Sequence, residues 1–507
     1  MKITRLSFAA VVACMATASF AATDLASAFK DGKLDGRVRA QYFYTDWDKN
    51  GAGNWGAAKP DMDGQGLALG GSLVYKTAPL YGISAGVGFY TTQNPNGITE
   101  LNSNARNTTA SDLFSRGPGS ATDFSKGYSV LAQSYIQYDI SKSTVKAGRF
   151  IMTNPFINPN DTKMIPLTVQ GASALVGEID NTAFMLDYAT AVKERGMDNF
   201  QNMATTGDTP DALKNYYQTT YTASGSVAAG YKAGSENAPS VLIGGVKNKS
   251  IKNLELQGWV MNWPDIVRQY MLEANYDMQF GKLGLKLGGR YMHQSDEGAG
   301  DIIRPKSGSF YSTTAATKFN STTAATKFKG DSDDKVDTHI YMLRAIASYE
   351  AAKFLLAYAS TDKGGDLLAP WRGFPTEGYT RSMTQTDWMA NTKSYKAQLD
   401  YDFSSFIKGF SALLGYSYYD RDPSRVPYQS MTDRYYGNGD TRQVNFDIQY
   451  KVPYVKGLEW KVRTMVQHNE KVGSITGNTA AGSTTYASGI GNDTSNKELR
   501  IEMNYFF

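Results

Sequence analysis

Ionic side chains recur at every second residue along several segments of this sequence. In residues 34–44, Arg37 and Arg39 share one parity with Asp35, and the alternate positions are mostly apolar. The basic residues on such polar faces are Arg37, Arg39, Lys286, Arg290, Arg344, Lys396, Lys461, Arg463 and Arg500. The acidic ones are Asp35, Glu273, Asp277, Asp400, Asp447, Glu459, Glu498 and Glu502. Rows of fixed charge that face water attract or repel dissolved ions, and nine basic groups against eight acidic ones leave the preferred sign undecided.

Groups that could catalyse a reaction or bind a metal are sparse. His293, His339 and His468 are the three histidines, and each is isolated in the sequence. There is no HExxH motif, and no motif places a nucleophile beside a base. We therefore expect no catalytic residue, no metal site and no cofactor, and we interpret the histidines as solvated strand ends.

The polar faces belong to segments whose other face is apolar. Val444, Phe446 and Ile448 alternate with polar residues in one such segment near the end of the chain. A soluble β-sandwich would also alternate, but its strands run for about 5–6 residues. The segments here run for roughly 10–14 residues, the length of a tilted strand that crosses a bilayer. An antiparallel transmembrane β-barrel is therefore the predicted all-β fold, because strands in lipid need a closed barrel.

Composition agrees with this fold. The chain has 507 residues, 12% of them aromatic, with 49 Gly, 16 Pro and 1 Cys. Its mean hydropathy is −0.41, and no apolar run beyond the N-terminus is long enough for a transmembrane helix. Aromatic residues are typical of strands and of the girdles around membrane barrels.

The alternation predicts about 18 strands joined by connections that are short and long in turn. The predicted strands are 34–45, 65–77, 81–93, 128–141, 143–152, 165–177, 181–192, 240–249, 252–263, 266–280, 282–294, 336–350, 352–362, 392–404, 408–421, 440–452, 457–469 and 494–507. The long connections are predicted outer loops, namely 94–127, 193–239, 295–335, 363–391, 422–439 and 470–493. Residues 312–320 are repeated almost perfectly at 321–329. Nine added residues would invert a strand's faces, so this repeat is expected in a loop.

Residues 1–21 have the three parts of a secretory signal peptide. Lys2 and Arg5 supply the charge, an apolar core follows, and cleavage is expected after Ala21 or, alternatively, after Ala18. Removal of Lys2 and Arg5 reduces 52 basic side chains to 50, against 48 acidic ones. This balance gives no electrostatic footprint for nucleic acid.

Cys14 lies inside the predicted signal peptide. The alternative is a lipoprotein box that ends at Cys14, which would make this residue a lipid anchor. On the main interpretation the mature chain has no cysteine, which excludes disulfides and thiolate chemistry. Residues 22–33 are then a short periplasmic segment, and residues 34–507 form the barrel.

Several motifs, in order along the chain, carry a resemblance to one family. They are the start at residues 24–39, Gly148-Arg149-Phe150 with Asn154-Pro155, Lys163-Met164-Ile165-Pro166 with Gln170-Gly171, Asp400-Tyr401-Asp402-Phe403, and Lys456-Gly457-Leu458. The chain also ends in Phe507 after an alternating strand, like outer-membrane barrels. In these features the chain resembles the OprD-type porins of the Gram-negative outer membrane, in their divergent major outer membrane porin branch.

The resemblance implies a third loop that folds inward to narrow the pore, a ladder of basic side chains that guides small carboxylates, and a homotrimer. The expected constriction residues are Asn154, Asn158, Asn160, Asp161 and Lys163, although the alternative is that they only hold turns around Pro155 and Pro159. The expected pore-lining residues are Arg37, Arg39, Lys286, Arg290, Arg344, Lys396, Asp400, Lys461 and Arg463.

The predicted function is passive diffusion of small hydrophilic solutes and ions through an outer-membrane porin, with carboxylate-bearing nutrients favoured by the resemblance. Outer-membrane lipid and lipopolysaccharide are the expected surroundings. The alternatives are a structural or adhesive surface barrel without an open channel, and a barrel hydrolase with Ser and His on its outer wall. A plugged active transporter would need about 22 strands and a plug domain before the first strand.

Overall fold

A computed structural model gives the fold of this chain. It describes residues 22–47, 63–95, 97–101, 110–115, 125–204, 238–299, 336–369, 371, 378–384, 388–421, 440–470, 476–479, 482–485 and 495–507. The predicted signal peptide 1–21 and the repeat at 312–329 lie outside these ranges.

The described part of the chain contains two short helices and 21 strands. The helices are α2 (Leu25–Lys30) and the 3₁₀ helix η2 (Ser111–Leu113). The strands are β1 (Lys33–Trp47), β2 (Gly64–Lys76), β3 (Ile83–Gln93), β4 (Tyr128–Ile140), β5 (Ser143–Phe150), β6 (Thr168–Val176), β7 (Thr182–Lys193), β8 (Gln201–Asn202), β9 (Val241–Asn248), β10 (Leu254–Trp263), β11 (Val267–Phe280), β12 (Leu283–Asp296), β13 (Thr338–Tyr349), β14 (Ala352–Thr361), β15 (Thr392–Asp402), β16 (Phe410–Arg421), β17 (Thr441–Lys451), β18 (Leu458–Asn469), β19 (Thr476–Thr479), β20 (Gly482–Thr485) and β21 (Asn496–Phe506).

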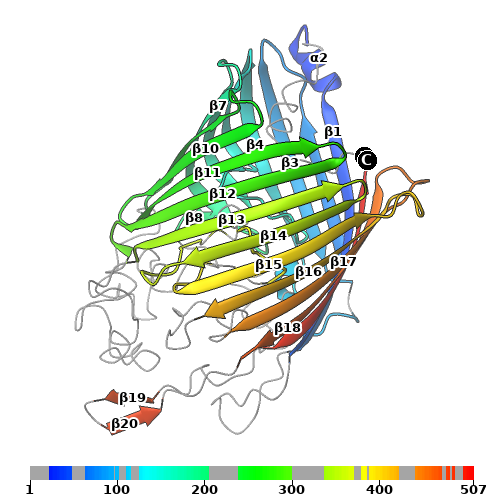
Figure 1. The fold of residues 1–507 in the computed structure, drawn as a ribbon. Helices are drawn as coiled ribbons and strands as arrows, with labels where there is room; N and C mark the ends of the chain where they lie inside the picture. Colours follow the sequence, from blue (N-terminus) through cyan, green and yellow to red (C-terminus); the bar gives the residue numbers. More distant parts are fainter. Residues whose placement is uncertain are drawn as a thin grey trace, which may run out of the picture.

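Eighteen of these strands form a closed antiparallel barrel (Figure 1). Each barrel strand pairs with the next one along the chain, and β21 closes the wall against β1 from Arg37↔Phe506 to Trp47↔Asn496. The short β8 adds to β7, and β19 and β20 form a separate hairpin. All eighteen strands begin and end within three residues of the predicted bounds, which confirms the predicted barrel.

The barrel wall has an apolar outer face. Leu272 and Leu343 are 61% and 62% exposed, whereas the neighbouring Met271 and Met342 are almost fully buried and face the interior. Exposed apolar side chains on alternate residues are the arrangement expected where the wall contacts lipid. No helix in the described part of the chain is both long and apolar enough to cross a membrane.

The interior is partly filled by connecting segments that pack on inward-facing apolar residues. One buried cluster joins Phe156 and Ile157 of the β5–β6 connection to Trp263, next to Trp371. A second cluster joins Phe43 of β1 to Phe114 and Ile165. The parity pattern predicted a polar inner face, but these inward positions are apolar because loop segments cover them.

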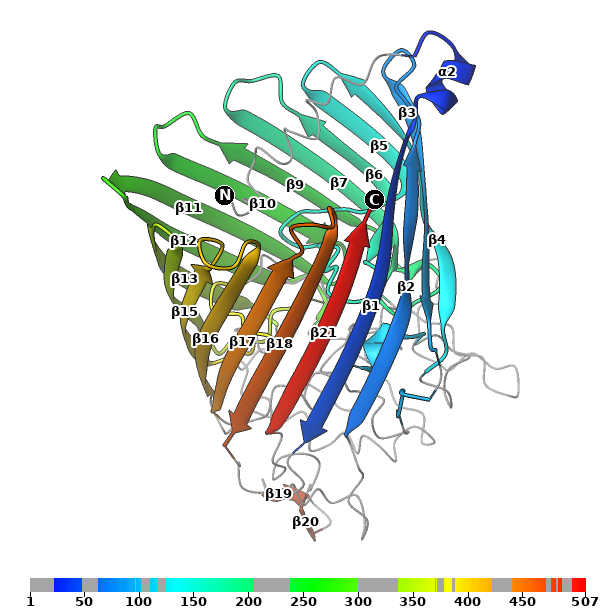
Figure 2. The same cartoon turned by 90° about the vertical axis from the view of Figure 1, so that its right-hand side faces the viewer.

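The two ends of the barrel differ (Figures 1 and 2). The end that carries α2 has short turns, and the hairpin β19–β20 lies beyond the opposite end. Helix α2 begins with a capping box, in which the Asp24 carboxylate accepts a hydrogen bond from Ser27 N and the Ser27 hydroxyl accepts one from Asp24 N. The hydrogen bond from Ser27 lowers the pKa of Asp24 below its ordinary value.

Two turn glycines at this end offer a matched test of assembly. Gly457 has φ +88°, and a Cβ there would lie 2.1 Å from the carbonyl oxygen of Phe506 in the closing strand β21. Gly281 has φ +57°, and a Cβ there would meet nothing within 4 Å. We expect Gly457→Ala to lower the folded fraction much more than Gly281→Ala, which carries only the cost of about 1 kcal/mol for a left-handed alanine. The folded fraction is measured from the difference in gel mobility between unheated and heated samples of the barrel. Equal effects of the two variants would contradict the prediction.

Candidate functional site

The connection between β5 and β6, residues 151–167, lies inside the barrel and narrows it. Asn154 holds one end of this segment, because its Nδ2 donates to Asp187 Oδ2 of β7 at 2.9 Å. Its Oδ1 accepts hydrogen bonds from the backbone N–H groups of Phe156 and Ile157 at 2.9 and 2.7 Å. The other end is held by Leu167 N, which donates to Pro159 O at 3.0 Å.

The remaining asparagines of this segment also hold turns. Asn158 Oδ1 accepts from Asn160 N at 3.0 Å, and Asn160 has φ +41°, a left-handed conformation that asparagine tolerates. Asn160 Oδ1 in turn accepts from the Thr162 hydroxyl at 3.1 Å. All three asparagines thus accept hydrogen bonds within their own turns, whereas Asp161 and Lys163 join charge clusters. The constriction role of the five residues remains a prediction.

Asp161 is shared by two arginines from β1. Arg37 and Arg39 both contact its carboxylate, Arg39 at 2.8 Å from Nη1 to Oδ1. Arg39 also donates from Nε to Asn504 Oδ1 of β21 at 2.6 Å and from Nη1 to the carbonyl of Lys163. These contacts attach the tip of the inward segment to the seam where β1 meets β21.

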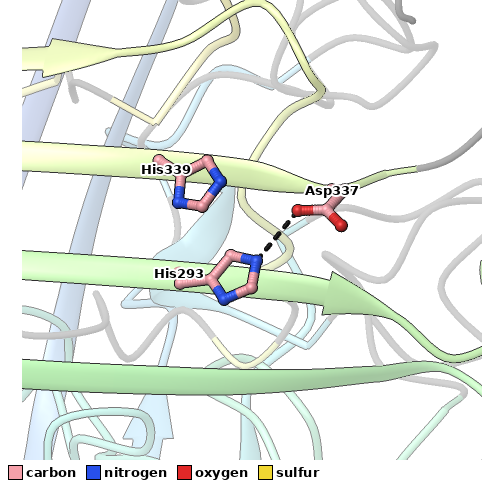
Figure 3. A group of neighbouring side chains, drawn as sticks. All are labelled: His293, Asp337 and His339. Carbon is pink, nitrogen blue, oxygen red and sulfur yellow. Dashed lines mark hydrogen bonds and ion pairs between the residues drawn. The ribbon is translucent and has the colours of Figure 1, made fainter.

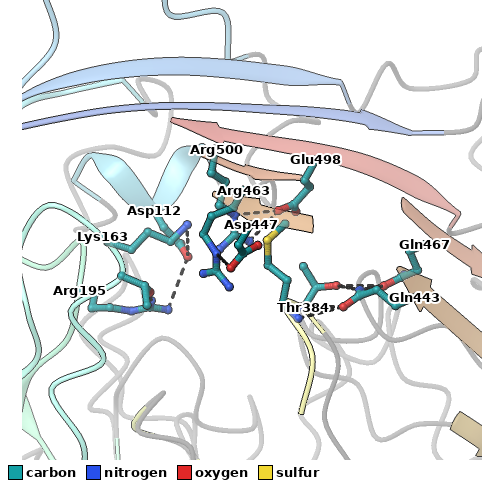
Figure 4. A network of polar contacts seen from close by, with 12 residues as sticks. Asp112, Lys163, Arg195, Thr384, Gln443, Asp447, Arg463, Gln467, Glu498 and Arg500 are labelled. Carbon is teal, nitrogen blue, oxygen red and sulfur yellow. Dashed lines mark hydrogen bonds and ion pairs between the residues drawn. The ribbon is translucent and has the colours of Figure 1, made fainter. Parts of the chain in front are cut away.

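A second carboxylate, Asp112 of η2, lies between Lys163 and Arg195 (Figure 4). Its Oδ2 is 3.9 Å from Lys163 Nζ and 3.8 Å from Arg195 Nη2. Lys163 Nζ also lies 4.3 Å from the centre of the Phe43 ring. Burial lowers the pKa of Lys163 well below its ordinary value of 10.5, although Asp112 opposes this shift.

The lowered pKa of Lys163 predicts a pH-dependent step in ion preference. A lysine with a depressed pKa is charged at lower pH and becomes neutral as the pH rises through that pKa, before ordinary lysines titrate. We therefore expect anion preference to fall as the pH is raised through the lowered pKa of Lys163, below the range in which ordinary lysines titrate. Reversal potentials measured as a function of pH should show the step in the wild-type channel, and Lys163→Met should remove it. An identical pH profile in both proteins would contradict the assignment.

The opposite part of the wall carries a third shared carboxylate, Glu273 of β11. Arg290 Nε donates to Glu273 Oε2 at 2.6 Å, and Arg344 Nη2 donates to Oε1 at 3.2 Å. The Tyr379 ring, from the connection between β14 and β15, lies 4.6 and 4.1 Å from the two guanidinium carbons. Burial raises the pKa of Tyr379, so its hydroxyl stays protonated at neutral pH.

Two further carboxylates each accept a hydrogen bond from an arginine. Arg463 Nε donates to Asp447 Oδ2 at 2.8 Å, and Arg500 Nη2 donates to Glu498 Oε2 at 2.6 Å. Figure 4 shows these pairs beside the Asp112 group, on strands β17, β18 and β21. Lys396 of β15 donates instead to a backbone carbonyl, that of Arg381, at 2.6 Å.

The remaining predicted pore-lining residues lie outside these clusters. Lys286 is paired with Asp277 at 2.7 Å, and Asp400 lies 3.7 Å from Lys353 Nζ. Both pairs lie near the end of the barrel that has short turns. Lys461 lies opposite Gln449 and Glu502 in the sheet register. The pore-lining role of the whole predicted set remains a prediction.

The parity of the strands did not identify several members of these clusters. Asp112, Arg195, Tyr379 and Arg381 lie in connections, where side chains have no fixed period. Parts of three predicted outer loops thus reach the lumen, at residues 110–115, 193–195 and 378–384. A run of ionic residues just after β7, Glu194-Arg195, was the one local signal that could have pointed to them.

A lipid-facing barrel with an inward segment that carries paired charges defines a membrane channel of the porin class. The model of the outer membrane porin, OprD family, matches residues 29–480. This chain therefore belongs to the OprD family of outer membrane porins, and it is a multi-pass β-barrel of the outer membrane. No curated protein matches it by sequence.

Solved structures of the same fold cover nearly the whole chain. Pseudomonas aeruginosa OpdK, solved with vanillate, has a TM-score of 0.63 at 14% sequence identity, and the match covers 94% of this chain and 99% of that one. Acinetobacter baumannii OccAB2 has a TM-score of 0.64 at 14% identity, with 95% and 99% covered. Acinetobacter baumannii OccAB3 has a TM-score of 0.62 at 17% identity, with 94% and 99% covered. At such identities the likeness shows the fold, and the family and structural neighbours are porins, not enzymes.

Proposed function

We propose that this porin passes small hydrophilic solutes by passive diffusion and favours those that carry a carboxylate. The preference is supported by two carboxylates in the lumen that each contact two arginines. Asp161 lies between Arg37 and Arg39, and Glu273 lies between Arg290 and Arg344. One carboxylate offsets one of the two cations, so each group has a local positive excess.

The proposed passage needs no energy coupling and no covalent step. A solute carboxylate would exchange part of its hydration for hydrogen bonds from a guanidinium, whose planar donors match two carboxylate oxygens. Because Asp161 and Glu273 already hold these arginines, the solute would compete with a fixed carboxylate and leave readily. Binding that is weak and repeated at several positions is what conduction requires.

The geometry supports this preference, and so does one neighbour. OpdK was solved with vanillate, which is an aromatic carboxylate. The charge clusters here lie on opposite parts of the wall, at β1 with β21 and at β11 to β13. A solute crossing the constriction would therefore meet donors from both sides.

Planar-bilayer recording and vesicle swelling test the proposal together. Purified protein should give discrete open steps, and swelling should be faster in benzoate than in benzylammonium, two ions of similar size. Equal rates would contradict the carboxylate preference while leaving the porin in place. Correctly inserted protein that never conducts would instead favour a structural or adhesive surface barrel.

We also infer that the channel works without a cofactor or an enzymatic activity, in outer-membrane lipid and lipopolysaccharide, as a homotrimer. The broad apolar outer wall supports the lipid contact. Light scattering of the detergent-solubilised protein, corrected for bound detergent, measures the oligomeric state, and a monomer mass would contradict the trimer.

A further inference from the structure

Two histidines that are distant in the sequence lie side by side in the barrel wall. The register of β12 and β13 pairs His293 directly with His339, and their ring centres are 4.4 Å apart at an interplanar angle of 7° (Figure 3). The two histidines are separated by 45 residues in the sequence. The antiparallel pairing of β12 with β13 brings them together, because facing residues in neighbouring strands have neighbouring Cβ atoms.

The pair faces outward, near the end of the barrel with long connections. Its neighbours on the same face, Tyr270 and Tyr341, are exposed, whereas the flanking Met292 and Gln294 are fully buried toward the interior. His293 is three residues before the end of β12, and His339 is the second residue of β13. The pair is thus accessible from outside the channel and separate from the lumen clusters.

A carboxylate and a tyrosine complete the group. His293 Nε2 is 2.9 Å from Asp337 Oδ1, just before β13, and Tyr291 Oη is 2.8 Å from His339 Nδ1. One ligand atom from each of His293, His339 and Asp337 lies within 4.8 Å of the others. The contact from Tyr291 occupies one ring nitrogen of His339, so Nε2 is the nitrogen available as a ligand. Metal-binding histidines commonly have a second hydrogen-bonded partner of this kind, which fixes the ring.

We propose that His293, His339 and Asp337 bind a divalent transition-metal ion such as Zn²⁺ on the outer wall of the barrel. Two imidazole nitrogens and one carboxylate oxygen are ligands that Zn²⁺ accepts, with a water in the fourth position. Bonds of about 2.1 Å require ligand atoms about 3.4 Å apart in a tetrahedron. The observed spacing reaches 4.8 Å, so the histidine side chains must rotate out of their stacked arrangement to bind the ion.

The ligands come from two adjacent strands, so the ion would join β12 to β13 at the rim. Asp337 is already next to His293, which makes His339 the ligand that must turn most. Imidazole binds a metal only in its neutral form, so we expect binding to weaken as the pH falls. Carboxylate and imidazole also favour Zn²⁺ over Mg²⁺, which prefers an all-oxygen shell.

Calorimetric titration of the full-length porin in detergent, after treatment with a chelator, tests the site. We expect one Zn²⁺ per chain, with at least tenfold weaker binding for His293→Gln, His339→Gln or Asp337→Asn. His468→Gln is the matched control, because His468 is an exposed histidine near the end of β18, and its binding should equal that of the wild type. Mg²⁺ should give no saturable heat at the same concentrations.

Two further measurements distinguish a lost metal ligand from a misfolded variant. Each variant should retain its heat-modified gel shift and its conductance in metal-free buffer, because the residues lie outside the lumen. The electron paramagnetic resonance spectrum of bound Cu²⁺ should show nitrogen coupling that is lost in the double variant His293→Gln/His339→Gln. The proposal is overturned if the wild type binds no Zn²⁺ beyond the level of this double variant, or if His468→Gln removes the binding.

Discussion

Replacing Arg290 and Arg344 together by glutamine is expected to shift the channel strongly toward cations. Both guanidinium groups contact Glu273, so their loss leaves a buried carboxylate whose two cationic partners are gone. The local charge changes from a positive excess to a negative one, and a buried charge acts over a longer range than an exposed one. The reversal potential in a KCl gradient should change sign or fall close to zero.

The double variant Arg290→Lys/Arg344→Lys is the matched control. It keeps both charges but loses the planar donors and the stacking on Tyr379. We expect its ion preference to stay near that of the wild type, with weaker discrimination between benzoate and a sulfonate of similar size. A glutamine variant with an unchanged reversal potential would show that these arginines do not line the conducting path.

Replacing Asp161 by asparagine is expected to loosen the inward segment and to strengthen anion preference at the same time. Arg37 and Arg39 are 9% and 4% exposed, and Asp161 is the carboxylate that both contact. Removal of one partner from a buried ion pair lowers the free energy of unfolding by about 3–5 kcal/mol. Because Asp161 is 38% exposed, we expect a smaller loss here, of about 2–3 kcal/mol. Urea unfolding in lipid vesicles measures the loss, and single-channel records should show more current noise.

Asp35→Asn provides the control for this prediction. Asp35 also pairs with a basic residue of β1, Lys33, but the two side chains are 61% and 77% exposed. Pairs this exposed contribute little to stability, so we expect Asp35→Asn to lower the free energy of unfolding by less than about 1 kcal/mol and to add no current noise. Equal destabilisation by the two variants would mean that Asp161 does not anchor the inward segment.

The strands were predictable because a half-buried strand has a local period of two. Residues such as Val444 and Phe446 alternate with polar neighbours whatever the rest of the chain does, so the pattern is visible in any short window. The same parity placed Arg290, Arg344 and Glu273 on one face before any contact was known. It could not show that they converge, because convergence depends on the pairing of β11, β12 and β13.

The inward segment was harder to predict. Its position was expected from resemblance, but asparagines that hold turns and charged residues that meet the wall look alike in the sequence. Asn154 caps backbone N–H groups, whereas Asp161 reaches arginines that are more than 120 residues away. The histidines show the same limit, because His293 and His339 become neighbours only through strand register.

The reversal potential of the wild-type channel in a planar bilayer tests most directly whether the shared carboxylates leave the lumen positive. With a tenfold KCl gradient at neutral pH, we expect the sign of an anion-preferring channel. A potential of the opposite sign, from channels that open in discrete steps, would contradict this charge assignment.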